Sequence, residues 1–588
     1  MKSILPTALV LGSAIGLACG STKSTTVVPM ESRVIGFHGD RAKLGWVQSA
    51  SFSTMDLRNY GLRPLWSSAR LDAVTIQGVE FAPHFYASPL LAREVRIDVP
   101  LFHGSTDVVL AASSNGMVYA VSAGGAITAG TVLWRTTLTR PMQIPKLDGG
   151  VPLGVLSTPI LNLDAPLGPT LYIASHDADR GWLVFAVLVS TGKILDRWPI
   201  VLDDASLSPK NLNGPARFHE SYEMSQRGAL ALSPLGDRLY VSFGSFSFAS
   251  VGWISAINTE NATITSTFST APDVETRSNG GMWGAGGPAV DDHGYVYVAT
   301  GNSPPGVADA PRTWGNSLLK FDRDLHLLER YTPFNYCKLD TNNIDLAGSA
   351  PMLLPDNPSA TPHVMVFGGK QGNVYLIDRD HLLAAGDRRS PCSTDVSTDR
   401  SLHPPEAQPQ FGARGPLNVF GPYTDDFGQV DYAKMRSRPA YFASKGAQYL
   451  YVSGATKAAA DSTVSVPPSL ARLRVVAEPG QQASLAIDRY NQVVSFVNPG
   501  SPVVVGGGNQ GGQPTVWVID ENAKRSASLL DPSTPKPVLY VFDGETLELL
   551  AHTREGELEI GGKYVTVAVA NGGVIVATDR IVAFGVGR

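Results

Sequence analysis

The residue types best suited to hold a cofactor stand around Trp283. The stretch GGMWGAGGPAV (280–290) is followed by a hydrophobic segment and then by Asn302. The flat ring of a tryptophan can stack on a planar ligand, and an amide oxygen can ligate a hard cation. The same residue types are typical of a sheet corner, where an asparagine bonds its own backbone and a tryptophan packs between sheets. The stretch therefore marks either the floor of a cofactor site or a corner between strands.

Three acidic residues near this stretch are interpreted as structural. Asp291 and Asp292 stand in VDDHGYV, which has the composition of a hairpin turn, and Asp309 stands in a polar loop. The segment FHESYEM (218–224) groups His219, Glu220 and Glu223. These residue types suit a metal or acid–base site, but a solvated loop before a strand explains them more simply.

Two glycine-rich motifs are not interpreted as nucleotide sites. Gly506, Gly508 and Gly511 have the spacing of a dinucleotide fingerprint, but QPTVWVID follows, which predicts a strand where that motif requires a helix. In GGKQGNVY (368–375) the lysine precedes the turn, so the segment predicts a β-hairpin. Lys370 facing a central channel would be a candidate anion-binding residue.

The N-terminus predicts an exported protein. One lysine precedes an apolar run from Ile4 to Ala18, which is too short for a membrane span and typical of a signal peptide. Residues 16–19, Gly-Leu-Ala-Cys, resemble a bacterial lipobox, with Gly16 as a departure from the pattern. The resemblance implies lipidation of Cys19; a simple secretory signal is the alternative. Cys337 and Cys392 then form a possible disulfide in an oxidising compartment, or remain two thiols.

Short strands and turns dominate the rest of the chain. The 588 residues include 59 glycines and 42 prolines, and 17% are charged. A pair of apolar strands around a polar turn recurs eight times, at 107–123, 169–193, 237–258, 293–322, 363–380, 448–475, 515–544 and 563–585. Such hairpins bury a face only by stacking on neighbours, and a closed ring removes exposed sheet edges. We therefore predict an all-β fold, a single β-propeller of eight four-stranded blades, with seven blades as the alternative.

The predicted boundaries are a signal peptide at 1–19, a flexible tether at 20–33, a segment packing on or closing the propeller at 34–75, and the propeller itself at 76–588. The polar, Pro- and Gly-rich insert 393–430 would lie on one propeller face and offer a partner surface. The net charge is −5 and no basic stripe stands out, so nucleic acid is not an expected partner. The cysteines and 11 histidines form no zinc-binding motif.

Several segments resemble one bacterial family. FAVLVSTGKILDRW (185–198) is similar to the blade signature of quinoproteins, and GVLSTPIL (154–161), the stretch around Trp283 and GGKQGNVYLIDRD (368–380) also fit. The chain past about residue 33 thus resembles the pyrroloquinoline-quinone-like (quinoprotein alcohol dehydrogenase-like) propeller proteins. That superfamily includes both dehydrogenases and non-catalytic propellers.

The resemblance implies a site for the quinone and calcium at the ring centre. In the dehydrogenases a tryptophan is the floor under the quinone, a glutamate and an asparagine hold Ca²⁺, and an aspartate is the base. The floor falls on Trp283 and the calcium asparagine on Asn302. The base position reads Asn316, and the calcium glutamate position reads Ser247. The sequence therefore keeps the floor and one amide and lacks both carboxylates, so calcium affinity should be low.

Three functions remain open. The first is a non-catalytic extracytoplasmic propeller, lipid-anchored or secreted, without a cofactor, that binds a protein, a glycan or a small ligand on one face or in its channel. The second is a quinone- and calcium-dependent alcohol dehydrogenase with altered ligands. The third is another enzyme, such as a lyase or hydrolase, that uses the central funnel. Contact with a membrane is expected only through an N-terminal lipid.

Overall fold

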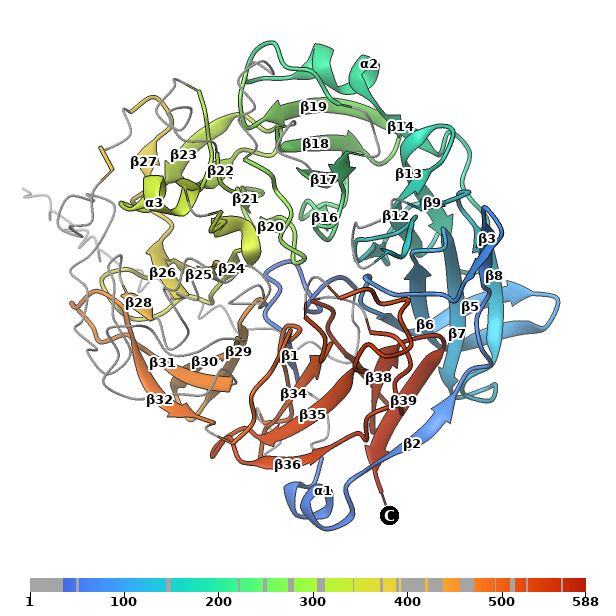
Figure 1. Cartoon of the computed structure of the whole chain (residues 1–588). Coiled ribbons are helices and arrows are strands. Elements are labelled where there is room, and N and C mark those ends of the chain that lie inside the picture. Colours follow the sequence, from blue (N-terminus) through green and yellow to red (C-terminus); the bar gives the residue numbers. More distant parts are fainter. Residues whose placement is uncertain are drawn as a thin grey trace, which may run out of the picture.

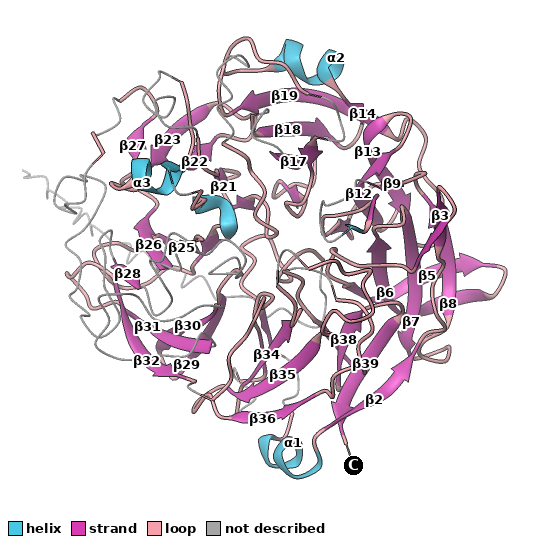
Figure 2. Ribbon diagram, viewed as in Figure 1, coloured by secondary structure: helices cyan, strands magenta, loops and turns pink. Residues whose placement is uncertain are grey.

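The computed structural model is a ring of eight β-sheet blades around a central axis (Figure 1). It describes residues 35–48, 52–143, 150–219, 223–246, 251–272, 280–303, 312–341, 343–370, 374–387, 391–392, 418–420, 437–454, 470–491, 493–507, 513–524, 527–561 and 564–587. The prediction of an all-β propeller with eight blades is confirmed. Almost all described elements are strands, and the few short helices lie between or outside the blades (Figure 2).

Each blade is a sheet whose strands follow one another from the axis outward. Blade 1 contains β5 (Leu90–Val99), β6 (Phe102–Ser113), β7 (Met117–Gly124) and β8 (Val132–Thr137), and blade 2 contains β11 (Ile160–Asn162), β12 (Thr170–Asp177), β13 (Gly181–Leu188) and β14 (Ile200–Leu202). Blade 3 contains β15 (Met224–Ser225) with β16 (Ala231–Leu232), β17 (Arg238–Ser245), β18 (Trp253–Asn258) and β19 (Thr263–Ser269). Blade 4 contains β20 (Ala289–Val290), β21 (Val296–Ala299), β22 (Leu318–Phe321) and β23 (Leu327–Tyr331), with β27 (Leu383–Ala384) on the outer edge. Blade 5 contains β24 (Met352–Leu353), β25 (Val364–Gly368), β26 (Val374–Asp378) and β28 (Asn418–Phe420), and blade 6 contains β29 (Ala440–Ser444), β30 (Ala447–Ser453), β31 (Leu470–Val476) and β32 (Ser484–Tyr490). Blade 7 contains β33 (Val503–Val505), β34 (Thr515–Asp520), β35 (Val538–Asp543) and β36 (Leu549–His552). Blade 8 contains β37 (Ala568–Ala570), β38 (Gly573–Ala577), β39 (Ile581–Val586) and β2 (Leu62–Ser67).

The remaining described elements lie outside these blades or along the channel. The strands are β1 (Trp46–Val47), β3 (Val74–Ile76), β4 (Val79–Phe81), β9 (Met142–Gln143) and β10 (Pro152–Leu153), and the helices are α1 (Thr54–Tyr60), α2 (Asp204–Leu207), η2 (Ser208–Lys210), α3 (Tyr336–Thr341) and η3 (Leu346–Gly348). Among the described residues, no helix is long and apolar enough to cross a membrane.

The N-terminal part of the chain supplies strands at two radii of the ring. β2 pairs with β39, so the last blade is completed by residues from the opposite end of the chain. This pairing closes the ring and covers the outer edge of β39. Residues 35–48, here called the central segment, instead lie along the channel, where β1 pairs with the inner strand β33 (Figure 1).

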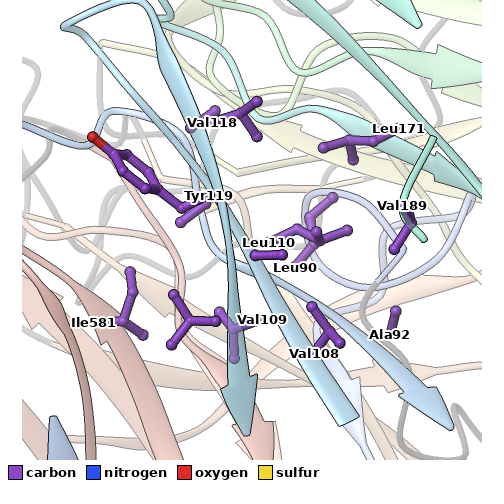
Figure 3. Packing of buried hydrophobic residues seen from close by; sticks show 14 of the residues in the cluster. Leu90, Ala92, Val108, Val109, Leu110, Val118, Tyr119, Leu171, Val189 and Ile581 are labelled. Carbon is purple, nitrogen blue, oxygen red and sulfur yellow. The ribbon is translucent and has the colours of Figure 1, made fainter. Parts of the chain in front are cut away.

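Apolar side chains fill the space between neighbouring blades. The cluster around blade 1 joins Val108, Leu110 and Val118 to Leu171 of blade 2 and Ile581 of blade 8 (Figure 3). The apolar faces of each blade are thus buried only by packing against the blades on either side.

A tryptophan–glycine contact fixes how blade 1 meets blade 2. Gly192, in the TGK turn after β13, has φ +72°, and a Cβ there would lie 2.8 Å from the ring of Trp134. The indole of Trp134 donates to the Val189 carbonyl at 2.8 Å. Glycine is required in this turn because the backbone is left-handed and the neighbouring ring leaves no room for a side chain.

A second set of contacts joins the blades next to the axis. The backbone N–H of Thr566 donates to Ser88 Oγ, and that of Ser88 donates to Thr158 Oγ1, both at 2.9 Å. The N–H of Arg438 donates to Ser501 Oγ at 2.8 Å. These residues lead into the inner strands of blades 8, 1, 2, 6 and 7, so each hydroxyl satisfies a buried donor of the adjacent blade.

Candidate functional site

The loop with Trp283 is held beside the loop with Asn302 by backbone hydrogen bonds. The N–H of Gly280 donates to the Asn302 carbonyl at 2.9 Å, and that of Gly301 donates to the Gly281 carbonyl at 2.8 Å. A Cβ at Gly244 would lie 2.6 Å from Trp283 Cβ, so glycine is needed for this close approach. The structure therefore brings together the two residues that the sequence proposed for one site, and it leaves the Trp283 ring partly exposed.

One polar atom of Asn302 has no hydrogen-bond partner among the described residues. Its side chain is buried, with 5% of the residue exposed, and no described residue donates a hydrogen bond to Oδ1. Its backbone N–H donates to Asp345 Oδ1 at 3.0 Å. A buried amide oxygen without a donor is costly, so this atom is suited to accept from, or to ligate, a bound group.

Asn316 is enclosed on both sides of its amide. The residue is fully buried and has φ +42°, a left-handed conformation that asparagine tolerates. Nδ2 donates to Asp340 Oδ1 at 2.7 Å, and Oδ1 accepts the N–H of Leu346 at 2.8 Å. The side chain thus positions α3 and η3, and an amide held in this way cannot take a proton from a substrate.

Two carboxylates that sequence analysis did not identify lie at this site. Asp340, in α3, also accepts the N–H of Ser303 at 2.8 Å, and Asp345 precedes η3; each is 5% exposed. They come from the connection between blades 4 and 5, outside the motif that the family resemblance covers. No sequence signal marked them, because buried aspartates in a connecting segment have the composition of an ordinary polar turn.

Lys370 lies on Trp283 and pairs with one of these carboxylates. Its ammonium is 5.3 Å from the centre of the Trp283 ring and forms an ion pair with Asp345 Oδ2. Its backbone N–H donates to the Asp345 carbonyl at 3.0 Å. The lysine therefore brings a cation to the aromatic face, in a cation–π arrangement. The sequence singled out Lys370 for a different reason, as a candidate anion-binding residue.

The other residues proposed from the sequence lie elsewhere. Asp291 accepts the N–H groups of His293 and Tyr295 in its hairpin turn, and Asp292 pairs with Arg41 at 2.9 Å. His219 Nδ1 and Glu223 Oε2 are 4.0 Å apart, which is a weak ion pair. The part of the chain that the structure describes holds no group of three or more His, Cys, Asp or Glu side chains placed for a metal.

Several proposed residues lie outside the described residues, namely Cys19, Glu220, Ser247, Asp309, Gly508, Gly511 and nearly all of the insert 393–430. The structure joins Cys337 and Cys392 in a disulfide bond, with their Cα atoms 6.0 Å apart. Cys337 is in α3, so this bond ties the helix that carries Asp340 to residues further along the chain.

The fold that holds this tryptophan, asparagine, lysine and aspartate is an eight-bladed ring. Three solved dehydrogenase structures resemble the chain in fold. The europium-containing methanol dehydrogenase has a TM-score of 0.55 and 13% identity over 93% of this chain and 89% of its own. The quinohemoprotein alcohol dehydrogenase from Pseudomonas putida HK5 has a TM-score of 0.55 and 13% identity over 95% of this chain and 80% of its own. The one from Comamonas testosteroni has a TM-score of 0.53 and 13% identity over 94% of this chain and 80% of its own. No family model and no curated protein matches the chain. At this identity the likeness establishes a shared fold.

The residues around Trp283 do not fit a calcium–quinone pair as they are arranged. Both Asp345 oxygens are engaged, one by the Asn302 N–H and one by the Lys370 ammonium. Asp340 Oδ1 accepts from Ser303 and Asn316. Ca²⁺ needs several oxygen ligands, and around Trp283 the described residues already engage both Asp345 oxygens and one Asp340 oxygen, while Asn302 Oδ1 accepts from no described donor. A cation at this place would have to displace Lys370 from Asp345.

Proposed function

We propose that this chain is an exported, non-catalytic binding module built on a quinoprotein-type propeller. The observation that carries the proposal is that Asn316 is fixed between Asp340 and Leu346, and the sequence resemblance matches this residue to the dehydrogenase base. An amide in that network supports the site's architecture and offers no proton acceptor.

The Trp283 site is proposed as the place where a small ligand binds. The partly exposed indole offers a stacking surface, and Asn302 Oδ1 offers a hydrogen-bond acceptor beside it. A protein or glycan partner on the 393–430 face is the other kind of ligand that the sequence supports.

Export is supported by two features. The N-terminus has the pattern of a signal peptide that ends at Cys19, and Cys337 and Cys392 are joined in a disulfide, as is typical of oxidising compartments. We propose that Cys19 carries a lipid. Intact mass measurement of the protein from membrane fractions of bacteria expressing the full chain tests this, with Cys19→Ser as the control. A mature wild-type chain whose mass is accounted for by its amino acids alone, without added acyl groups, would contradict lipidation.

The alternative function is a quinone- and calcium-dependent dehydrogenase. It is favoured by the gathering of Trp283, Asn302, Asp345 and Lys370 at one place near the axis. The experiment that separates the two functions is a titration of the mature protein with pyrroloquinoline quinone and excess Ca²⁺, followed by tryptophan fluorescence. Trp283→Phe keeps an aromatic ring in the loop and removes the reporting indole.

We expect that the quinone and Ca²⁺ do not quench Trp283, so the wild type and Trp283→Phe respond alike. We also expect no oxidation of alcohols with an artificial electron acceptor. Tight quenching that needs both Ca²⁺ and Trp283, followed by alcohol oxidation, would overturn the non-catalytic proposal in favour of the dehydrogenase. Quenching without turnover would identify the site as one that binds the quinone without using it.

A further inference from the structure

The central segment brings a buried lysine to the loop that follows Trp283. The Lys43 residue is 1% exposed, and its ammonium donates to the Gly286 carbonyl. The segment reaches several blades: the Leu161 N–H donates to the Ile35 carbonyl, and the Tyr441 N–H donates to the Leu44 carbonyl, both at 2.7 Å. Lys43 is therefore held inside the ring between blades.

Arg438 places a second cation beside this segment. It stands directly before Pro439 at the start of the inner strand of blade 6, where blades 1, 2 and 7 have Ser88, Thr158 and Ser501 before a proline. Its backbone N–H follows the ring pattern and donates to Ser501 Oγ. The side chain breaks the pattern, because a long guanidinium group replaces a hydroxyl next to the axis.

The Arg438 guanidinium has no partner among the described residues. The residue is 1% exposed, and neither Nε, Nη1 nor Nη2 has a hydrogen-bond acceptor there. A Cβ at Gly286 would lie 3.0 Å from Nη1, so the loop after Trp283 packs against the group and shields it from water. A buried guanidinium without an acceptor carries a large desolvation penalty, so such groups are normally paired.

The ionisable groups around Arg438 leave an excess of positive charge. The one carboxylate that acts on Arg438, that of Asp40, already accepts the N–H groups of Lys43 and Leu44. With all three groups ionised, Lys43 and Arg438 outweigh Asp40 by one charge. Burial lowers the pKa of Arg438 to about 9, so the group remains charged at neutral pH. The pKa of Lys43 is lowered chiefly by burial and also by the charge of Arg438. A nearby anion would raise that pKa again.

The packing around the guanidinium limits the size of a partner. A Cβ at Gly286 would already lie 3.0 Å from Nη1 and 2.7 Å from the Ala350 side chain, so this side of the group is crowded. The small cavity of about 10 Å³ nearby is lined by Gly284, Gly287 and Ala350, and neither Arg438 nor Lys43 belongs to its lining. Crowding at Gly286 and a single excess charge therefore favour a small monovalent anion such as chloride or formate.

We propose that Arg438 and Lys43 form a buried site for one small monovalent anion, which fixes the central segment to blade 6. The chemistry is that of a halide or a formate-sized carboxylate accepting from a guanidinium and an ammonium. This site is separate from the stacking face of Trp283, and the inference does not depend on the proposed function. Its ligand stabilises the folded chain by mass action, because the site is assembled from segments far apart in sequence.

The test is thermal unfolding of the full mature chain at constant ionic strength, with gluconate replaced stepwise by chloride, bromide or formate. We expect a saturable rise of the Tm in the wild type and none in Arg438→Met. We also expect that, in gluconate alone, Arg438→Met is at least as stable as the wild type, since it removes an unpaired buried charge. Arg474→Met is the matched control, because Arg474 is an exposed arginine of the same blade and should leave the anion response intact.

Two results would overturn the proposal. One is an equal anion response in the wild type and Arg438→Met, which would indicate a general salt effect. The other is a wild type whose Tm does not depend on the anion. If the variant does not fold, calorimetric titration of the wild type with chloride in gluconate buffer decides: one saturable site supports the proposal, and the absence of saturable heat contradicts it.

Discussion

The side-chain amide of Asn316 donates to Asp340 Oδ1 across 2.7 Å in the buried interior near the axis. The relationship joins the loop after β21 and α3, two segments that supply different parts of the Trp283 site. It also gives Asn316 a structural role, because both ends of its side-chain amide are engaged. Its consequences for stability can be measured without knowing any ligand.

Changing Asn316 to aspartate should destabilise the protein in a pH-dependent way. Two carboxylates at this separation must share a proton, which raises the pair's pKa above that of the unfolded chain. The folded state then binds more protons, so stability falls as pH rises above about 4. We expect a loss of about 3 kcal/mol in the free energy of unfolding at neutral pH, and a smaller loss at about pH 5.

Urea unfolding at several pH values measures this dependence. Asn316→Gly is the control, because glycine accepts the positive φ and introduces no charge. Its loss of stability should depend less on pH than that of the aspartate variant, because it removes one donor to Asp340 and adds no second carboxylate. An aspartate variant with the same pH profile as the glycine variant would show that the two side chains are not coupled.

The sequence predicted the fold because the two middle strands of each blade are apolar and follow one another directly along the chain. All eight predicted hairpins correspond to the two middle strands of a blade, from β6 and β7 to β38 and β39. The inner and outer strands were harder to find. β20 and β37 have only two and three residues, too few for a period of alternation to appear.

The site was only partly predictable. Trp283 and Asn302 could be found because they belong to a local motif, and the backbone pairing of their loops brings them together. Asp340, Asp345 and Arg438 reach the axis through tertiary contacts between segments far apart in sequence. A single sequence contains no local signal for such contacts, and an arginine before a proline gives no indication that it is buried.

Removing the hydroxyl of Ser88 should weaken the joint between the last blade and the first. Ser88 Oγ accepts the N–H of Thr566, which is 2% exposed and would be left without an acceptor. We expect Ser88→Ala to lower the free energy of unfolding by about 2 kcal/mol, measured by urea denaturation.

Ser113→Ala is the matched control for this change. Ser113 is a fully buried serine of the same blade whose hydroxyl has no partner in the described part of the chain. Its replacement should be close to neutral. Equal losses for the two variants would mean that the inter-blade hydrogen bond at Ser88 contributes no more than packing does.

Breaking the disulfide between Cys337 and Cys392 should destabilise the protein. The two residues are separated by 55 positions, and the chain entropy released by opening a loop of this size corresponds to about 4 kcal/mol. The double variant Cys337→Ser/Cys392→Ser should therefore unfold at a lower temperature. A reducing agent should lower the Tm of the wild type and leave that of the double variant unchanged; a wild type indifferent to reduction would contradict a stabilising bond.

Acid should destabilise the protein through His176 before most carboxylates titrate. The residue is 1% exposed in β12, with its ring 5.2 Å from that of Trp182. Burial lowers the pKa of His176 from 6.5 to about 4. Between these values the unfolded chain binds a proton that the folded chain does not, so stability is fully present above about pH 6.5 and is lost as pH falls toward 4. The shift corresponds to about 3 kcal/mol across that window.

His176→Phe removes this titration and keeps an aromatic ring against Trp182. Burial also lowers the pKa of His38, so the measured quantity is the difference between the two proteins. The free energy of unfolding of the variant should fall less steeply than that of the wild type between about pH 6.5 and 4. Parallel pH profiles would mean that His176 is protonated equally in the folded and unfolded chains, and that its burial does not oppose the charge.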